Sequence, residues 1–269
     1  MSIIVNNLEK INITKIKQAK NRYKLTVITA YDALFANLFS KSADMILVGD
    51  SLNMSFAGKK DTLSASLEQM IYHTNAVCNG APSSFVITDM PFGTYINKDE
   101  ALRNCAKVYQ ETNASAVKIE GGEDKADIIK HLTSNSIAVM GHIGLMPQYV
   151  RSEGGYKVRG KNLQDEEQLI RDAIAIEKAG AFAIVVEGVM SDVAQKITKA
   201  INIPTIGIGA GNQTDGQVLV WSDMLGFFEE FKPKFVRHYL NGASLVKNAV
   251  EQYRIDVQTQ NFPNKEEEY

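Results

Sequence analysis

AVKIEGG, residues 116–122, is the stretch from which the architecture of the chain is most easily worked out. It is a short apolar run that ends in glycines, which predicts a buried β-strand. Side chains alternate along a strand, so Lys118 and Glu120 leave the same face near its carboxyl end. Charges are costly to bury unless they are paired or bind something, so this strand end carries either a structural ion pair or part of a functional site. Considered alone, the stretch leaves both interpretations open.

The same pattern, an apolar run followed by an acid, a glycine or a turn, recurs along the chain and predicts eight strands. These are residues 25–30, 45–48, 85–88, the stretch 116–122, 137–140, 182–186, 204–208 and 217–220. Between them we expect helices from Asp32 to Ser40, from Ser64 as N-cap to Val77, from the N-cap Asn97, over 123–133, from Asp165 to Gly180 and over 191–200. Alternating strands and helices indicate a parallel sheet, and eight such units indicate a (β/α)8 TIM barrel of the α/β class.

We expect residues 1–269 to form a single domain, because one barrel of this length is common and 45% of the residues are hydrophobic. A short helix within the first 21 residues leads into the barrel. Past Pro233 the pattern is helical to about Val257, and a loose, charged tail follows.

The composition argues against several classes of partner. A formal net charge of -2 gives no electrostatic reason to expect nucleic acid or an anionic membrane surface. No apolar run is long enough to cross a bilayer, and the first residues lack the features of a signal peptide, so we expect a cytoplasmic protein. Cys78 and Cys105 fall in helical patterns without metal-ligand spacing, which is typical of buried reduced thiols.

Charged residues follow several of the predicted strands. In a TIM barrel the loops after the strands share one face, so residues at the carboxyl ends converge there although they are far apart in the chain. The residues in such positions are Asp50, Asp89, Lys118, Glu120, His142 and Glu187. The sequence therefore predicts a charged site at the mouth of the barrel.

Three of these residues are candidate ligands of a cation. Carboxylates gathered at one mouth repel each other unless something neutralises them, and an all-oxygen set without Cys or paired His favours Mg²⁺ over Zn²⁺. We predict one Mg²⁺ per chain, with Asp50 and Asp89 as direct ligands and Glu120 as a ligand directly or through water. The alternative is that each acid only caps the helix that follows it.

Such a site suits proton abstraction from a 2-oxo acid. Mg²⁺ with open coordination positions binds the carboxylate and keto oxygens and polarises the carbonyl, and Lys118 adds positive charge near the developing enolate. Glu187 ends the apolar run FAIVV, where loss of solvent raises the proton affinity of a carboxylate. We therefore predict Glu187 as the base, with helix capping as the alternative.

Other residues and loops keep two interpretations each. Ser51 offers its hydroxyl and N–H to a substrate carboxylate, or it only forms a turn. His142 contacts substrate, or it is a hydrogen-bonded core histidine, whereas we treat His73 as structural. The glycine-rich residues 207–216 lack the G-x-G-x-x-G pattern and are weak evidence for an anion site. The glycine-rich, basic loop 153–161 is a candidate lid or interface loop.

Several motifs together resemble the ketopantoate hydroxymethyltransferase family, also called 3-methyl-2-oxobutanoate hydroxymethyltransferases, over residues 13–253. The motifs are TAYDA (29–33), LVGDSL (47–52), YHT (72–74), KIEGG (118–122), GHIGLMPQ (141–148), GGYKVRG (154–160) and IPTIGIGAGNQTDGQVLV (203–220). The chain departs from the family pattern at Asn53, Met146 and Ser222, where glycine, threonine and histidine are usual. These departures affect loop detail and the folate pocket and spare the proposed ligands and base.

The resemblance implies transfer of a hydroxymethyl group from the cosubstrate 5,10-methylenetetrahydrofolate to 3-methyl-2-oxobutanoate. The product is 2-dehydropantoate, used for pantothenate and coenzyme A biosynthesis. By matching position, Asp50, Asp89 and Glu120 are the Mg²⁺ ligands, and Glu187 is the proton acceptor. The resemblance places Ser51, Asp89 and Lys118 against the oxo acid, with Asp50 and His142 as further expected contacts. It also implies a homodecamer of two pentameric rings.

Two other classes remain as alternatives at this point. A Mg²⁺-dependent lyase or mutase of the phosphoenolpyruvate/pyruvate type uses similar barrels and also binds oxo acids. A catalytically idle barrel kept as a binding or scaffold protein is the second alternative. Its weakness is that an idle site has no reason to retain acids that repel each other.

Overall fold

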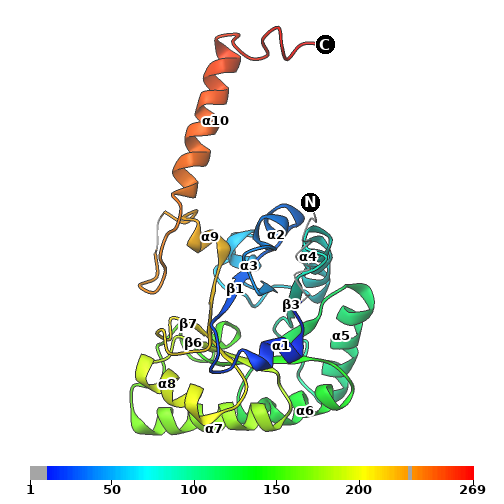
Figure 1. Cartoon of the computed structure of the whole chain (residues 1–269), viewed down its shortest axis with the longest axis vertical. Helices are drawn as coiled ribbons and strands as arrows, with labels where there is room; N and C mark the ends of the chain where they lie inside the picture. The colour runs from blue at the N-terminus through cyan, green and yellow to red at the C-terminus, as the bar shows by residue number, and fades with distance from the viewer. Residues whose placement is uncertain (1–10, 230–231) are drawn as a thin grey trace, which may run out of the picture. The chain divides into compact units, whose positions relative to one another are not determined.

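The computed structural model describes residues 11–229 and 232–269 and contains a closed barrel of eight parallel strands. The strands are β1 (Leu25–Thr29), β2 (Met45–Val48), β3 (Phe85–Asp89), β4 (Ala116–Glu120), β5 (Val139–Gly144), β6 (Ala183–Glu187), β7 (Thr205–Ile208) and β8 (Gly216–Leu219). Each strand pairs with the next, and β8 pairs with β1 to close the barrel. The predicted (β/α)8 TIM barrel is confirmed (Figure 1).

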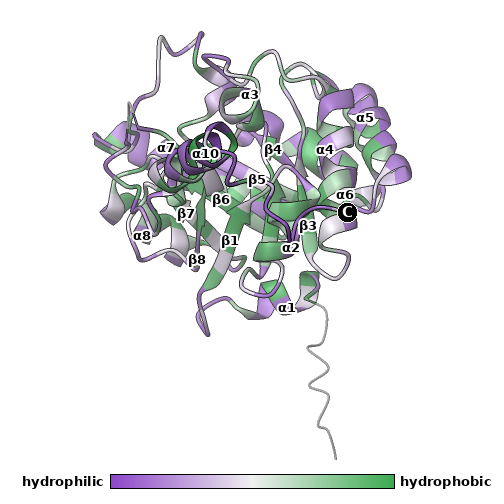
Figure 2. Cartoon of the chain, turned by 90° about the horizontal axis from the view of Figure 1, so that it is seen from above, coloured by the Kyte–Doolittle hydropathy of each residue, from purple (hydrophilic) through white to green (hydrophobic). Residues whose placement is uncertain are grey.

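Helices follow the strands and cover the outside of the barrel (Figures 1 and 2). They are α1 (Ile13–Gln18), α2 (Ala33–Phe39), α3 (Leu52–Ser55), α4 (Leu67–Gly80), α5 (Lys98–Glu111), α6 (Ala126–Ser134), α7 (Leu163–Lys178) and α8 (Ser191–Ala200), with the short 3-10 helices η1 (Glu123–Lys125) and η2 (Pro147–Tyr149). The short leading helix expected near the amino terminus is α1, although residues 1–10 lie outside the described part of the chain.

The predicted N-caps Asp32 and Asn97 and the helix start at Ser191 are confirmed, whereas the starts expected at Ser64 and Asp165 are wrong. The side chains of Asp32 and Asn97 cap α2 and α5 by accepting backbone N–H groups. The helix expected from Ser64 begins after Ser66, which forms a capping box with Gln69, because the Ser64 hydroxyl accepts a hydrogen bond from Asn53 instead.

The helix expected from Asp165 is likewise displaced. It begins at Leu163, after the N-cap Asn162. The carboxylate of Asp165 accepts hydrogen bonds from the guanidinium of Arg159, so it serves the preceding loop while Asn162 takes the capping position.

Strand β5 begins later and runs further than expected. The sequence predicts this strand over residues 137–140, but β5 extends to Gly144 because residues 140–144 pair with β6. His142 therefore lies within a strand, facing the barrel mouth, and not in the loop after it. Its position is set by sheet pairing, which makes it more rigid than a loop residue.

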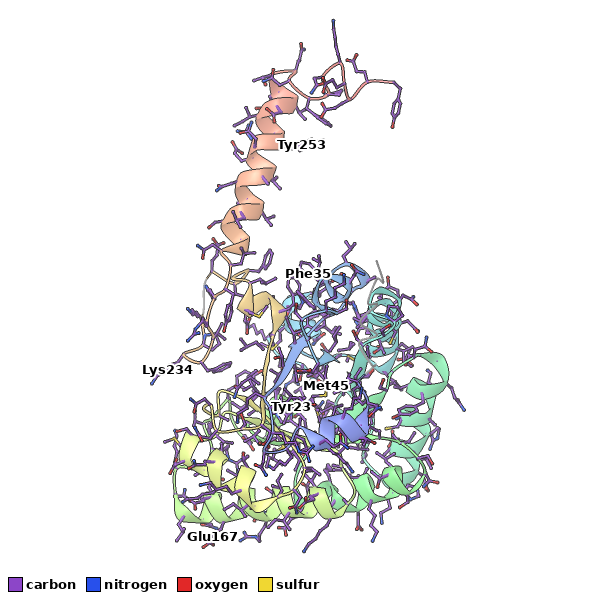
Figure 3. All side chains as sticks on the ribbon, in the orientation of Figure 1. Tyr23, Phe35, Met45, Glu167, Lys234 and Tyr253 are labelled. Carbon is purple, nitrogen blue, oxygen red and sulfur yellow. The ribbon has the colours of Figure 1, made fainter. Side chains whose placement is uncertain are left out.

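Two apolar clusters hold the barrel together. The first fills the barrel, and its members include Leu25, Met45 and Phe85, with Ile16 and Ala19 of the α1 region packed against the same cluster. The second lies between the strands and the helices, and Val117 and Ile119 of β4 belong to it. In Figure 3, Met45 lies inside the barrel and Glu167 of α7 projects from the outer surface.

Strand β4 is buried on both faces, as parallel barrel strands are. Val117 and Ile119 point toward the helices, and Ala116 points into the barrel. Alternation then directs Lys118 and Glu120 inward as well, which confirms the expectation from AVKIEGG.

The chain divides into two compact units, one ending at Leu219 and one from Val220 to Tyr269. The second unit contains α9 (Trp221–Met224) and α10 (Gly242–Gln258), and the Trp221 and Phe227 rings lie 5.4 Å apart within it. The helix expected past Pro233 begins only at Gly242, but it ends close to Val257 as expected. The organisation of residues 1–269 as a single domain stays a prediction.

Cys78 and Cys105 are buried, as the sequence predicts for reduced thiols, and burial raises the pKa of Cys105 to about 12. Among the described residues, none of the helices has both the length and the apolar character needed to cross a membrane.

The packing of α2 against α4 yields a stability prediction. A Cβ at Gly80 would lie 2.1 Å from the carbonyl oxygen of Ala33, a backbone atom that cannot move aside easily. We expect Gly80→Ala to lower the free energy of unfolding by about 1–3 kcal/mol, as overpacking does. Urea denaturation followed by circular dichroism measures this, with Asn79→Ala on the exposed side of the same helix as control. Equal stability of both variants and wild type would contradict the packing described.

Candidate active site

The predicted site residues meet at the carboxyl ends of neighbouring strands. Asp89 ends β3, Lys118 and Glu120 lie in β4, His142 lies in β5 and Glu187 ends β6. Asp50 follows β2 directly after Gly49. Asp50, Asp89, Lys118, Glu120 and His142 each keep at most 4% of their surface exposed, so their charges are removed from solvent.

Asp50 and Asp89 are joined directly. The backbone N–H of Asp50 donates to Oδ2 of Asp89 over 3.0 Å. Burial, followed by the charges of Asp89 and Glu120, raises the pKa of Asp50 well above its usual value. Burial also raises the pKa of Asp89, although Lys118 opposes this change. The positive charge within the site, that of Lys118, therefore does not fully compensate the negative charge of the buried carboxylates.

Lys118 supplies positive charge within the cluster. Its Nζ lies 3.1 Å from Oδ1 of Asp89 and 3.9 Å from Oε1 of Glu120. Burial lowers the pKa of Lys118, but the carboxylates of Asp89, Glu120 and Asp50 raise it by more, so it stays protonated. The ion pair considered for AVKIEGG thus exists, but as part of a larger cluster and not as an isolated structural pair.

His142 lies between the cluster and Glu187. Its Nδ1 is 3.0 Å from Lys118 Nζ, and its Nε2 is 3.3 Å from Oε2 of Glu187. An ammonium group can only donate, so in this arrangement Nδ1 accepts and Nε2 carries the proton that faces Glu187. Burial and Lys118 lower the pKa of His142, and Glu120 and Glu187 raise it to about 9. The two acids thus favour the imidazolium at neutral pH, whereas the 3.0 Å contact with Lys118 Nζ requires an unprotonated Nδ1, because two cations would not approach so closely, and corresponds to the neutral imidazole.

Glu187 is the most accessible carboxylate of the set. Its side chain keeps 21% of its surface exposed, against 1% for Glu120. Desolvation by the run FAIVV is therefore partial, because the end of β6 opens toward the mouth. A partly open position also leaves space through which a substrate can approach this carboxylate.

Ser51 is half-buried at the edge of the cluster. Its Oγ lies 2.8 Å from the hydroxyl of Tyr31, and either oxygen can be the donor. A Cβ at Gly49 would lie 2.7 Å from this Oγ, so glycine is needed there for Ser51 to keep its place. Tyr31 belongs to the TAYDA motif, but the sequence had suggested no role for it.

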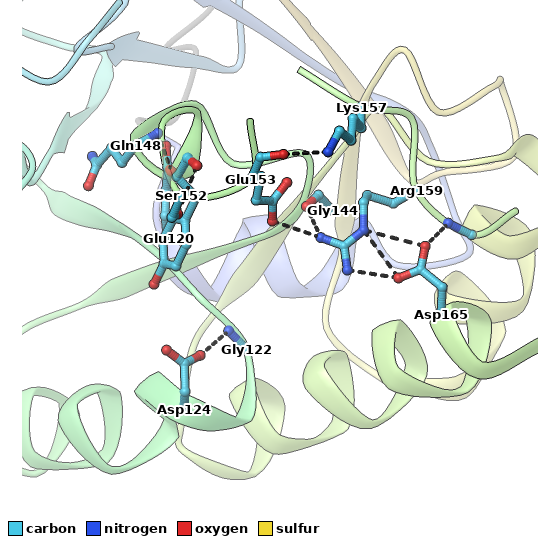
Figure 4. Close-up of polar contacts among 12 residues, drawn as sticks. Glu120, Gly122, Asp124, Gly144, Gln148, Ser152, Glu153, Lys157, Arg159 and Asp165 are labelled. Carbon is cyan, nitrogen blue, oxygen red and sulfur yellow. Dashed lines mark hydrogen bonds and ion pairs between the residues drawn. The ribbon is translucent and has the colours of Figure 1, made fainter. Parts of the chain in front are cut away.

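Gln148 is a residue of the cluster that the sequence did not single out. Its side-chain amide donates to Oδ2 of Asp50 over 2.8 Å. Its backbone N–H donates to Oε2 of Glu120 over 3.0 Å, and Figure 4 shows Gln148 beside Glu120. It is the last residue of GHIGLMPQ, so the motif contained it, but no spacing rule assigns a glutamine beyond a strand to carboxylates on two others. Tyr95, which contacts Gln148, had no sequence signal at all.

The cluster has features that suit a hard divalent cation. Asp89 Oδ1 and Glu120 Oε1 are buried oxygens that accept no hydrogen bond among the described residues, and their contact with a cation is the ion pairing with Lys118 described above. No three His, Cys, Asp or Glu side chains of residues 11–229 and 232–269 form a group arranged to hold a metal ion. The three carboxylates are therefore not preassembled as a ligand set. Their oxygen donors suit Mg²⁺, and the roles of Asp50 and Asp89 as direct ligands and of Glu120 as a ligand directly or through water stay predictions.

The loop 153–161 is anchored beside this site. The guanidinium of Arg159 binds Asp165 and Glu153 (Figure 4). The backbone N–H of Arg159 donates to the carbonyl oxygen of Gly188, the residue after Glu187, over 2.8 Å. Arg151 binds Asp61 of another loop over 3.1 Å. These contacts connect the loop to the mouth, and whether it serves as a lid or an interface stays open.

The remaining expectations concern structural roles. Nδ1 of His73 lies 2.6 Å from Tyr31 O, which agrees with a structural histidine. Asn53 is buried, and its Nδ2 donates to Asp61 O over 2.8 Å and to Ser64 Oγ over 3.0 Å, so this departure from the family pattern fastens the loop after α3.

The barrel and its buried acidic mouth define a class of protein, the TIM-barrel enzymes that carry their site at the carboxyl ends of the strands. The chain is similar in fold to 2,3-dimethylmalate lyase, a member of the PEP mutase/isocitrate lyase superfamily. That match has a TM-score of 0.61, 16% identity and coverage of 91% of this chain and 88% of the other. Phosphonopyruvate hydrolase, in a complex with oxalate and Mg²⁺, matches with a TM-score of 0.61, 13% identity and coverage of 95% and 92%. At these identities the likeness shows the fold alone.

The sequence comparisons are more specific. Residues 10–265 match the family model described as ketopantoate hydroxymethyltransferase. The 3-methyl-2-oxobutanoate hydroxymethyltransferase of Aliarcobacter butzleri (strain RM4018) is 82% identical over the full length of both chains. The enzyme of the same name from Helicobacter pylori (strain ATCC 700392 / 26695) is 56% identical, also over the full length of both. The chain belongs to the ketopantoate hydroxymethyltransferase family and is an enzyme of the transferase class.

The buried ion pair yields a prediction with a matched control. We expect Lys118→Met to lower the free energy of unfolding by about 3–5 kcal/mol, because it leaves buried carboxylates without their cation. The double variant Lys118→Met/Asp89→Asn should recover part of this loss. The exposed pair of Lys98 and Asp127 has the same 3.1 Å separation, so a comparison of the two pairs isolates the effect of burial from that of distance. Lys98→Met should cost less than about 1 kcal/mol in the same urea titration. Similar losses for the two lysines would show that burial of the cluster is not what matters.

Proposed function

We propose that the chain transfers a hydroxymethyl group from 5,10-methylenetetrahydrofolate to 3-methyl-2-oxobutanoate in a Mg²⁺-dependent, aldol-type reaction. The product, 2-dehydropantoate, serves pantothenate and coenzyme A biosynthesis. The observation that carries the proposal is the convergence of Asp50, Asp89, Lys118 and Glu120, with Glu187 next to them at the open side. Membership of the family supports the same reaction.

One Mg²⁺ per chain, held by Asp50 and Asp89 and by Glu120 directly or through water, would supply Lewis-acid polarisation of the oxo acid. The buried oxygen of Glu120 that accepts no hydrogen bond, and that of Asp89, which is only ion-paired with Lys118, support this assignment. A solved protein of this fold, phosphonopyruvate hydrolase, has been crystallised with Mg²⁺ and oxalate, and oxalate resembles the carboxylate and keto oxygens of an oxo acid.

Different residues are proposed to contact different groups of the substrate. Ser51 is proposed to donate to the carboxylate of the oxo acid, together with Asp50, Asp89 and His142 as further contacts. Lys118 is protonated and buried, so it stabilises negative charge that develops on the keto oxygen. A buried ammonium acts strongly here because little solvent screens it.

Glu187 is the proposed base. It takes the proton from C3, and the electrons of that C–H bond pass toward the keto oxygen. C3 then forms a bond to the methylene carbon of the folate as the bond from this carbon to one folate nitrogen breaks. Water supplies the hydroxyl group as the bond to the second nitrogen breaks, and the two nitrogens receive the proton taken by Glu187 and the remaining proton of the water. His142, whose Nε2 lies 3.3 Å from Glu187 Oε2, is proposed to orient the carboxylate before it accepts the proton.

The proposed location is the cytoplasm, where reduced cysteines persist, and Cys78 and Cys105 are buried thiols. The proposed partners are the two small-molecule substrates and further copies of the chain, with neither nucleic acid nor membrane expected.

The second unit supports assembly into a homodecamer of two pentameric rings. On α10, Val246, Val250, Tyr253 and Val257 recur at spacings of four, three and four residues and are each at least 45% exposed. A stripe with this spacing forms one apolar seam along a helix, and such a seam is normally covered by another helix. Further copies of the chain are the proposed cover.

The chemistry is tested by hydrogen exchange. With Mg²⁺ and without folate, we expect the wild type to exchange deuterium into C3 of 3-methyl-2-oxobutanoate. Glu187→Gln should lower the exchange rate by ~10²–10⁴-fold, the usual contribution of a general base. Nuclear magnetic resonance follows the exchange.

Two controls accompany this measurement. Glu166→Gln removes a carboxylate that pairs with Lys196 on the outer helices and should leave exchange unchanged. A chelator should abolish exchange and, with both substrates present, formation of 2-dehydropantoate. Exchange that persists in Glu187→Gln would remove the base assignment, and a wild type without exchange or product would favour an idle barrel.

Assembly is tested by sedimentation. The wild type should sediment with the mass of about ten chains, and Val250→Asp should produce smaller species, because it places a charge within an apolar seam. Gln252→Asp on the same helix introduces the same charge at a polar, exposed position and should not change the mass. A monomeric wild type would contradict the proposed decamer.

A further inference from the structure

Gln148 joins three strand ends of the barrel. It lies in η2, directly after β5, and it is 4% exposed. Its side-chain Nε2 donates to Asp50 Oδ2 over 2.8 Å, beyond β2, and to Met90 O over 2.9 Å, beyond β3. Its backbone N–H donates to Glu120 Oε2 over 3.0 Å, at the end of β4. One residue therefore binds two of the three clustered carboxylates, and at Glu120 it binds Oε2 while Lys118 contacts Oε1.

Tyr95 determines the orientation of this amide. The Tyr95 hydroxyl donates to Oε1 of Gln148 over 2.5 Å, and its side chain is buried. Burial raises the pKa of Tyr95 well above its usual value, so the hydroxyl keeps its proton and remains a donor. A flipped amide would place Oε1 against the carboxylate and the carbonyl, which are both acceptors. Only the orientation with Nε2 toward Asp50 satisfies all of these groups.

Gln148 also occupies one oxygen of each of these two carboxylates. Oδ2 of Asp50 and Oε2 of Glu120 are taken by Gln148, while Oε1 of Glu120 accepts no hydrogen bond. Partners that occupy one oxygen of a carboxylate restrict its rotation and so orient the other oxygen. Neutral donors achieve this without adding a charge that would compete with a cation.

We propose that Gln148 is a positioning residue that orients Asp50 and Glu120 for the divalent cation, and that Tyr95 acts through Gln148. The proposal rests on the Mg²⁺ site of the proposed function. It assigns Gln148 no contact with the substrate, so its loss weakens cation binding and leaves the base chemistry intact once the cation is bound.

The experiment measures cation binding without turnover. Mn²⁺ is titrated into metal-free protein, and free Mn²⁺ is followed by electron paramagnetic resonance. Gln148→Met keeps the length of the side chain and the backbone N–H but removes the amide. We expect it to raise the Kd for Mn²⁺ by ~10–100-fold, the usual effect of losing a group that orients a ligand. In the C3 exchange assay its Mg²⁺ requirement should rise similarly, while the rate at saturating Mg²⁺ stays within about threefold of wild type.

Two further variants separate positioning from loss of structure. Tyr95→Phe removes one hydroxyl and should raise the Kd by about fivefold, in keeping with one hydrogen bond. The double variant should bind no more weakly than Gln148→Met, since Tyr95 acts only through Gln148. Gln168→Met is the matched control, because Gln168 also donates to two carboxylates, those of Glu123 and Asp172, on the outside of the barrel. It should leave the Kd within about twofold.

The outcomes distinguish this proposal from the proposed function. Thermal unfolding of each variant verifies that it is folded. Gln148→Met and Tyr95→Phe that bind Mn²⁺ as wild type does would overturn the positioning role while the metal-dependent reaction stands. A loss in Gln148→Met that saturating Mg²⁺ does not relieve would also overturn it. A wild type that binds no Mn²⁺ would overturn the metal site and the positioning role with it.

Discussion

The arrangement of the barrel mouth depends on neutralising carboxylates that are buried together. Asp50, Asp89 and Glu120 are nearly inaccessible to solvent, and Lys118 is the buried cation in contact with two of them. Burial and mutual repulsion raise the pKa of Asp50 well above its usual value, which shows that full ionisation of the three carboxylates is unfavourable. A site that stores unfavourable electrostatics in this way is prepared to receive a cation, because the cation relieves the repulsion that folding created.

The barrel makes this concentration of charge tolerable. Each acid is held at the end of a strand whose neighbours are fixed by parallel pairing, and apolar clusters pack the interior and the space under the helices. The donors that partly satisfy the acids come from the same framework: the backbone N–H of Asp50, the amide of Gln148 and the ammonium of Lys118. Their positions follow from the register of the sheet, so the cost of burial is offset by many packing contacts elsewhere.

The site combines a buried carboxylate cluster with a partly exposed base, and His142 lies between the two. The carboxylates around Lys118 are closed to solvent, which strengthens their electrostatic interactions. Glu187 is partly open, which leaves room for a substrate beside the base, and His142 connects the two regions through its two ring nitrogens. The closed and open parts lie on adjacent strands, β4 to β6, so binding and proton removal occur side by side.

The sequence by itself determined the barrel, the side of β4 on which Lys118 and Glu120 lie, and the set of residues at the mouth, because strand periodicity and the order of elements are local properties of the chain. Its motifs also pointed to the family. Where residues compete for a partner, the sequence was insufficient. Ser64 was expected as a helix cap and Asp165 as a helix start, but Asn53 and Arg159 bind their side chains. Strand β5 extends to Gly144 because β6 pairs with it. The roles of Gln148 and Tyr95, and the partial exposure of Glu187, were decided only by the tertiary structure. Hydrogen bonds between residues distant in the chain depend on distances in space, and no pattern along a single strand or helix encodes those distances.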